Sequence, residues 1–364
     1  MKKISQRQLI IFYCIYSFAI KFLMLPQLLS THAGKDAWLS ALFGTVLELA
    51  VLFLVLNVLI IGRDGDIYSD IRNNTKAIGG KIIIALMLAV FLLQAFILIR
   101  SAYHLLNDNL FEDISVKLFS VPMLIMGIFF CFLPARAIFR SGEIFYVFII
   151  IGIALSVFPA LSQISASEIL PIADHGAKPM FTGFYYNLIY FESASFLLMF
   201  SGDIKIEKHF RKKFMITAGI VGLFFVFFVF MFYSLFGPLA ATKNIAVANL
   251  TLYSSFITNN GRLDWVLITI WLLLLMLRFG VTFYCCFTAV RYITNVKHRA
   301  GLIGLPLAVF IYLITTLLFA SQESLNNFIK NIPWLIAGLY ILIPVLFFIN
   351  SLINKKKKAE VTHV

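Results

Sequence analysis

The sequence predicts an all-α membrane protein with ten transmembrane helices. Of its 364 residues, 61% are hydrophobic and 13% are charged. A soluble domain has roughly 45–50% apolar and roughly 25% charged residues. The chain also contains ten apolar runs, each long enough to cross a hydrocarbon core about 30 Å thick. Lys and Arg are divided unequally between alternate connections, as is typical of a polytopic membrane protein.

The ten predicted spans are separated by short connections. In chain order they are 8–29, 38–61, 82–106, 117–133, 143–161, 184–201, 214–236, 264–288, 301–320 and 332–353. The longer connections 162–183 and 237–263 have room for short interfacial helices. No connection has room for a soluble domain, so we expect one integral membrane domain over residues 1–364. Residues 354–364 form a basic tail.

Basic residues predict the orientation of the chain. Segments on the side of the N-terminus hold 21 of the 30 Lys and Arg, the opposite connections hold six, and three lie inside spans. The positive-inside rule therefore places both termini in the cytoplasm. The Lys355–Lys358 run fits an anchor against anionic lipid headgroups. The bilayer thus accounts for the net charge of +13, and no nucleic-acid partner is expected.

Motifs for catalysis or cofactor binding are missing from the sequence. The four cysteines (Cys14, Cys131, Cys285 and Cys286) lie in apolar runs without metal-ligand spacing, so they are predicted to be small buried residues. The sequence has no GxxxxGK[ST], HExxH or GxSxG motif. We expect no cofactor and no metal.

The stretch 184–201 is apolar enough to cross a bilayer, yet Glu192 lies at its middle. A carboxylate near the bilayer centre costs several kcal/mol, so it marks a functional site by default. Small polar neighbours can satisfy backbone groups where a membrane helix unwinds. We therefore predict an interrupted helix that lines a polar cavity, with Phe191, Glu192 and Ser193 in the site.

Four further charged residues lie inside spans, and each has a structural alternative. Lys21 and Arg100 could face the cavity or could extend toward an interface by snorkelling. Arg278 is far from both interfaces and is predicted to pair with a carboxylate or contact a ligand. Glu48 could be functional, or it could pair with a neighbouring donor in a packing helix. With Lys21 we include its neighbours Ser17, Ala19 and Ile20 in the site.

Ten spans divide into two halves of five with opposite topology, about 8–161 and about 184–353. Inverted repeats of this kind place a ligand at the midplane, where the first helix of each repeat is broken. We therefore expect spans 1 and 6 to be interrupted. The two halves show no repeat at the level of individual residues.

Several short motifs carry a resemblance to a known family. They are Ile4-Ser5-Gln6-Arg7-Gln8-Leu9, Leu25-Pro26, Ala33-Gly34-Lys35-Asp36-Ala37-Trp38-Leu39-Ser40, Ser141-Gly142-Glu143 and the basic loop Lys205–Lys213. The order of these motifs resembles that in the B subunit of the spore germinant receptors. The chain length and the number of spans also resemble those of that subunit. These are endospore germination permeases of the amino acid–polyamine–organocation superfamily. The segment at 33–40 is the most specific of the motifs.

The resemblance implies a ten-helix LeuT-like bundle with broken helices 1 and 6, in the inner membrane of a dormant spore. It implies a protein that binds a small nutrient, often an amino acid, and triggers germination. It also implies two partners, a membrane A subunit and a lipoprotein C subunit. The sequence departs from the family at Ala19-Ile20-Lys21, where relatives tend to have small residues or glycine.

The charges suggest how a zwitterionic amino acid could bind. Lys21 or Arg100 would bind its carboxylate, Glu192 would accept from its ammonium, and Arg278 would keep Glu192 ionised in the absence of ligand. The alternative is an amino-acid transporter of the same superfamily, either a uniporter or coupled to protons through Glu192, with Lys21 in place of a sodium ion.

A more remote alternative is an integral membrane acyltransferase. His104 and Asp108 have HxxxD spacing, which would suit a histidine base oriented by a carboxylate. The pair falls at the end of a span and fits a helix end better. We therefore expect that the protein is not an enzyme.

Overall fold

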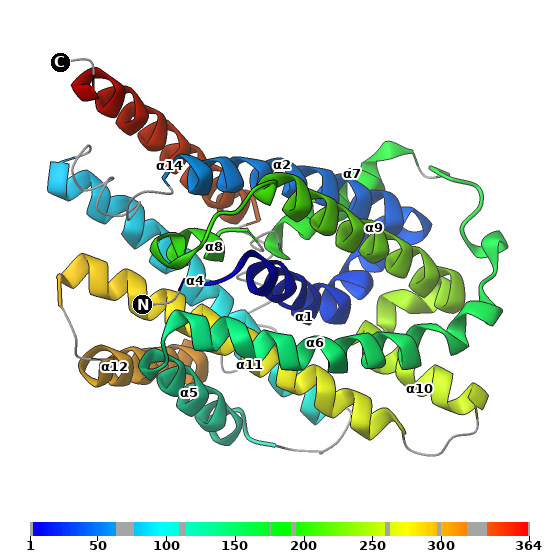
Figure 1. Ribbon diagram of the computed structural model, residues 1–364. Coiled ribbons are helices and arrows are strands. Elements are labelled where there is room, and N and C mark those ends of the chain that lie inside the picture. The colour runs from blue at the N-terminus through cyan, green and yellow to red at the C-terminus, as the bar shows by residue number, and fades with distance from the viewer. Residues whose placement is uncertain are drawn as a thin grey trace.

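The computed structural model is an all-helical bundle, and it describes residues 3–62, 76–108, 114–174, 176–190, 194–258, 263–296, 300–318 and 333–362. Figure 1 shows α1 in the middle of the bundle, with α9 and α2 on one side of it and α6 and α11 on the other. The C-terminal helix α14 projects beyond the other helices at one end of the molecule. The most N-terminal long helix is therefore the one around which the others pack.

Each of the ten predicted spans corresponds to helical structure. The helices are α1 (Gln6–Ala33), α2 (Ala37–Ile61), α4 (Lys76–Asn107), α5 (Val116–Phe132), α6 (Ala135–Val157), α7 (Ala177–Asn187), α8 (Phe196–Met199), α9 (Phe210–Phe236), α10 (Ala246–Thr258), α11 (Leu263–Thr294), α12 (Ala300–Leu313) and α14 (Pro333–Thr362). Among the described residues, six stretches are long and apolar enough to cross a membrane, and the first of them contains both α1 and α2. Two shorter apolar helices lie at Val116–Phe132 and Ile303–Leu317.

The start of α1 is fixed by local hydrogen bonds that its sequence encodes. Ser5 is the N-cap and forms a capping box with Gln8, whose side chain also donates to Glu143 over 3.4 Å. Just before the cap, Ile4 forms a parallel β-bridge with Ile204. The Ile4–Gln8 motif therefore ties the N-terminus both to α6 and to the segment that follows α8.

The expected interruption of span 1 is wrong, because α1 is a continuous helix of 28 residues. The reason is its composition. It contains no glycine, and its one proline, Pro26, is accommodated without ending the helix. The central residues Ala19 and Ile20 are completely buried among apolar neighbours, where helical hydrogen bonds are the best way to satisfy the backbone.

The interruption of span 6 is confirmed. Helix α7 ends at Asn187, a 3₁₀ turn (η4) covers Leu188–Tyr190, and the short helix α8 begins only at Phe196. The segment starts earlier than hydropathy suggested, at Ala177 rather than at residue 184. Polar and glycine positions in the first turns of α7 lower the local hydropathy and hide its true start.

The short helices expected in the two long connections are also present. The connection before α7 contains 3₁₀ turns η2 (Pro159–Gln163) and η3 (Ala166–Glu168). The connection after α9 contains η6 (Gly237–Thr242) and α10. At the C-terminus, α14 continues as a helix through the basic tail to Thr362. The four cysteines are buried and none is in a disulfide, as predicted.

Candidate functional site

The end of α7 is held in place by a close contact with α2. Asn187 donates from Nδ2 to the carbonyl oxygen of Ser40 over 3.2 Å, and Ser40 Oγ donates to the Met180 carbonyl over 2.7 Å. Gly44 permits this approach, since a Cβ at that position would lie 1.8 Å from Asn187 Nδ2. The position at which the helix breaks is therefore set by side-chain hydrogen bonds as well as by local sequence.

Gln94 of α4 lies beside the 3₁₀ turn that follows α7. Its Nε2 donates to the hydroxyl of Tyr340 on α14 over 2.8 Å and lies 3.4 Å from the Ile189 carbonyl oxygen. The residue is fully buried, and its Oε1 has no hydrogen-bond partner in the part of the chain that the structure describes. Gln94 was not predicted as a site residue, although an amide in the middle of an apolar span is a signal of the same kind as a charged residue there.

Arg278 of α11 packs against α1. Its Nη1 donates to the Tyr16 carbonyl oxygen over 2.6 Å, and its guanidinium carbon lies 4.3 Å from the centre of the Tyr16 ring. The Tyr16 hydroxyl lies 3.0 Å from Thr282 Oγ1, one turn along α11. Arg278 therefore joins α11 to α1 at Tyr16, whose ring centre lies 4.3 Å from that of Phe196 at the start of α8.

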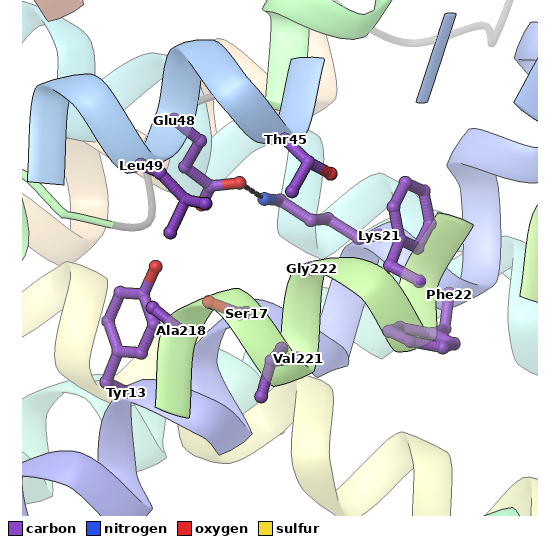
Figure 2. Close-up of a pocket in the computed structure, with 11 residues that line it drawn as sticks. Tyr13, Ser17, Lys21, Phe22, Thr45, Glu48, Leu49, Ala218, Val221 and Gly222 are labelled. Atoms are coloured by element: carbon purple, nitrogen blue, oxygen red, sulfur yellow. Dashed lines mark hydrogen bonds and ion pairs between the residues drawn. The ribbon is translucent and has the colours of Figure 1, made fainter. Parts of the chain in front are cut away.

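Lys21 and Glu48 form a buried ion pair between α1 and α2 (Figure 2). The two residues are 8% and 9% exposed. They line a cavity of about 20 Å³ together with Ser17, Thr45 and residues of α9, and a single water needs roughly 10–15 Å³. Within the described residues, Glu48 Oε1 has no hydrogen-bond partner. The structure thus brings Ser17 and Lys21 together, and the donor expected to pair with Glu48 is Lys21.

Arg100 takes no part in the contacts described above for Gln94, Arg278 and Lys21. It is six residues beyond Gln94 on α4, which corresponds to a rotation of about 120° between their side chains. Its guanidinium lies 5.8 Å from the Tyr103 ring, and the residue is 2% exposed. Nε and Nη2, the two nitrogens of one guanidinium edge, have no hydrogen-bond partner among the described residues.

The remaining predicted site residues are placed as follows. Ala19 and Ile20 are fully buried in the apolar core, three and four residues after Tyr16 and therefore on its side of α1. Phe191, Glu192 and Ser193 lie outside the described residues, so the predicted proximity of Glu192 to Lys21 or Arg278 stays a prediction.

The described residues also show how the titratable side chains are grouped. In the described ranges, no three His, Cys, Asp or Glu side chains are grouped so that they could hold a metal ion. His104 Nδ1 and Asp108 Oδ1 lie 3.7 Å apart at the C-terminal end of α4, too far for a hydrogen bond. The arrangement offers a cation and an amide near a helix break, which suits recognition of a small polar ligand.

Comparison with known proteins gives two matches at the level of sequence. The profile described as "Spore germination protein" matches residues 3–329. YfkT of Bacillus subtilis (strain 168), provisionally described as a spore germination protein, is 24% identical over 358 residues, which cover 96% of each chain.

Solved structures resemble this chain in fold. MhsT, solved in complex with L-phenylalanine, superposes with a TM-score of 0.63 over 96% of this chain and 89% of its own, at 13% identity. The manganese transporter of Eremococcus coleocola, in complex with an aromatic bis-isothiourea substituted compound, gives a TM-score of 0.50 over 93% and 87%, at 12% identity. The fold is therefore LeuT-like, and these low identities carry no information about ligands.

Proposed function

Because this chain belongs to the spore germination protein family, we propose that it is the membrane subunit of a nutrient germinant receptor. Family membership and the LeuT-like fold confirm the resemblance drawn from the sequence and make the chain an integral membrane protein. The rest is proposal: the protein lies in the inner membrane of the spore with both termini cytoplasmic. It acts there with a membrane A subunit and a lipoprotein C subunit.

The interrupted helix is the observation that carries this proposal. Between α7 and α8 the chain leaves helical geometry beside the buried amide of Gln94, and the buried guanidinium of Arg278 contacts Tyr16, which packs against Phe196 at the start of α8. Backbone groups released at a helix break can bind a ligand, and a buried cation favours a carboxylate. A small amino acid or similar nutrient has the charges that these groups recognise.

In this mechanism Arg278 binds the ligand carboxylate. Glu192 and the Oε1 atom of Gln94 accept hydrogen bonds from the ligand ammonium. Lys21, which the sequence also suggested as a carboxylate donor, is engaged with Glu48 and supports α1 instead. Signalling requires that the ligand bind one state of the bundle better than the other, and a difference of roughly 5.5 kcal/mol reverses a population from 1:99 to 99:1.

The test compares two probes that differ only in the carboxylate, L-phenylalanine and L-phenylalaninamide, within a wider panel of amino acids and their amides. Binding to the purified protein in detergent is measured by calorimetry. We expect at least one amino acid to bind more tightly than its amide. Since hydrogen bonds to charged groups contribute roughly 1.5–3 kcal/mol, Arg278→Gln should reduce this preference by about 10–100-fold.

The matched control is Arg291→Gln, which removes an exposed arginine of the same helix. It should leave the preference unchanged. If Arg278→Gln weakens acid and amide equally, Arg278 only supports the fold and the assigned role is wrong. If no amino acid on the panel binds the wild-type protein, the ligand class is wrong.

An amino-acid transporter is the second candidate, and the LeuT-like fold favours it because that fold also occurs in the manganese transporter. Uptake of a labelled ligand into proteoliposomes separates the two functions. A receptor subunit binds the ligand without net uptake, whereas a transporter accumulates it or equilibrates it. Uptake that increases with an inward proton gradient would identify the proton-coupled form.

A further inference from the structure

Two cavities between α1 and α9 open to the surface of the molecule. Near the start of both helices is a cavity of about 450 Å³, lined on α1 by Gln6, Arg7, Ile10 and Ile11 and on α9 by Lys213, Ile216 and Thr217. Further along lies a cavity of about 370 Å³, and Thr217 lines both. The two cavities therefore adjoin at Thr217, and together they are called the groove.

The chemistry of this groove changes along its length. The first cavity contains the guanidinium of Arg7, the ammonium of Lys213 and the carboxylate of Glu207. The second is lined almost entirely by apolar side chains from three helices, among them Ile15 and Phe18 of α1, Ile149 and Ile153 of α6, and Ile220 and Phe224 of α9. A molecule that fills the whole groove must have a polar, anionic end and a long apolar part.

Gln6 shows that the polar cavity is a formed site and not merely a surface hollow. The residue is 3% exposed, yet neither its Nε2 nor its Oε1 has a hydrogen-bond partner among the described residues. A buried amide without partners is costly, so such a group is expected to bind something that enters the cavity. The carboxylate of Glu207 lies 3.5 Å from the ammonium of Lys205, which offsets its charge.

The length of the groove matches one leaflet. From Arg7 to Phe18 there are eleven residues, which rise about 16 Å along a helix. Half of a hydrocarbon core is about 15 Å. The basic end lies at the starts of α1 and α9, and the apolar end lies near the middle of both helices.

We propose that this groove binds an anionic glycerophospholipid. Arg7 and Lys213 bind the phosphodiester, Gln6 hydrogen-bonds to the glycerol or ester region, and one acyl chain lies between α1, α6 and α9. Because the acyl chain is already in an apolar medium, headgroup contacts and close packing supply the selectivity. The bound lipid would also support α1, the helix that carries Tyr16 and Lys21.

Native mass spectrometry of the protein released from vesicles of equimolar phosphatidylglycerol and phosphatidylcholine tests this proposal. We expect the wild-type protein to retain phosphatidylglycerol preferentially. Arg7→Gln combined with Lys213→Gln should lower that preference by at least fivefold. Lys208→Gln combined with Lys212→Gln removes the same charge from exposed positions outside the groove and should leave the preference unchanged.

A second pair of variants tests the acyl-chain position. Ala154 lines the apolar cavity, so Ala154→Phe should fill it and reduce lipid retention, whereas Ile151→Phe on the exposed face of α6 should not. Equal loss in both charge variants, or unchanged retention in Ala154→Phe, would overturn the proposal. Binding of soluble glycerol phosphate as tightly as phosphatidylglycerol would also overturn it, since the site would then be a pocket for free phosphates.

Discussion

At the scale of single residues, the ion pair between Lys21 and Glu48 is the feature with the largest energetic consequence. Both side chains are about nine-tenths buried, and they join two helices that pack side by side (Figure 2). Bringing two charges out of water is costly, and their attraction offsets this cost only while both are present. The pair therefore constrains α1 and α2 strongly even if it adds little net stability.

Removing one partner should reveal this constraint. We expect Lys21→Met to destabilise the protein by about 3–5 kcal/mol, because it leaves the Glu48 carboxylate buried without its cation. Adding Glu48→Gln should recover much of that loss, since no uncompensated charge then remains. Thermal and denaturant unfolding of the purified single and double variants measures both effects.

A surface pair of similar geometry provides the control. Lys35 lies 2.7 Å from Asp174, but the Asp174 side chain is 45% exposed, so Lys35→Met should cost no more than about 1 kcal/mol. Equal destabilisation by Lys21→Met and Lys35→Met would mean that burial does not make the Lys21 pair special.

The charged residues could be found in the sequence, but their pairing could not. Lys21, Glu48, Arg100 and Arg278 each stood out because charge inside an apolar span is costly. Which of them meet depends on the rotation of each helix about its axis, which a stretch that is apolar on all sides does not encode. Lys21 thus meets Glu48, 27 residues away, and Arg278 contacts the backbone and ring of Tyr16.

At the scale of elements, the segment 33–40 acts as an anchor for α7. Gly34 has φ +56°, a conformation that glycine adopts easily, and it ends α1 sharply. Asp36 then accepts from the backbone N–H of Ala173 over 3.0 Å, and Ser40 binds two points of α7. The motif that resembled the family most specifically is therefore the one that positions the interrupted helix.

Gly44 should be intolerant of substitution for the same reason. We expect Gly44→Ala to destabilise the protein by about 1–3 kcal/mol, because its Cβ would overlap Asn187 Nδ2 at the end of α7. If the assigned contact is responsible, Asn187→Ala in the Gly44→Ala background should recover part of the loss. Denaturant unfolding of the four proteins forms a double-mutant cycle.

Gly219 of α9 offers a matched control. A Cβ there would meet no atom within 4 Å, so Gly219→Ala should be neutral or slightly stabilising. Additive effects of the changes at Gly44 and Asn187 would contradict the proposed role of this contact.

The continuity of α1 was not predicted, because the prediction for span 1 relied on inverted-repeat symmetry and not on the residues of that span. Inverted-repeat symmetry suggested that spans 1 and 6 are both broken, but only span 6 has polar residues at the break and an anchoring amide before it. The absence of glycine in span 1 was visible and pointed to the observed outcome. Symmetry of topology therefore does not require symmetry of local structure.

At the scale of the whole molecule, hydropathy predicted the positions of the helices well because the bilayer imposes a minimum apolar length on each span. Burial within the bundle was harder to predict, since lipid-facing and core-facing positions are both apolar here. For the same reason, the proposed lipid groove could not be predicted from the sequence. Its lining residues come from three helices, and each set alone resembles any other apolar helix surface.

The last prediction concerns the orientation of the chain across the membrane. Helix α9 has 27 residues and is therefore about 40 Å long, so its two ends must reach opposite faces of the membrane. Lys208 precedes α9, is exposed, and lies in the basic loop next to the N-terminal bridge, whereas Thr242 is exposed just after the helix. Unequal Lys and Arg on the two sides predict that Lys208 lies in the cytoplasm and Thr242 outside.

Labelling with a membrane-impermeable maleimide tests this in right-side-out vesicles. We expect Thr242→Cys to react in intact vesicles and Lys208→Cys to react only after permeabilisation. Background should be low because the four native cysteines are buried. A membrane-permeable maleimide should label both variants and serves as the control. The reverse pattern would invert the orientation and place the basic end of the lipid groove in the outer leaflet, because Arg7, Lys213 and Lys208 lie at the same end of α1 and α9.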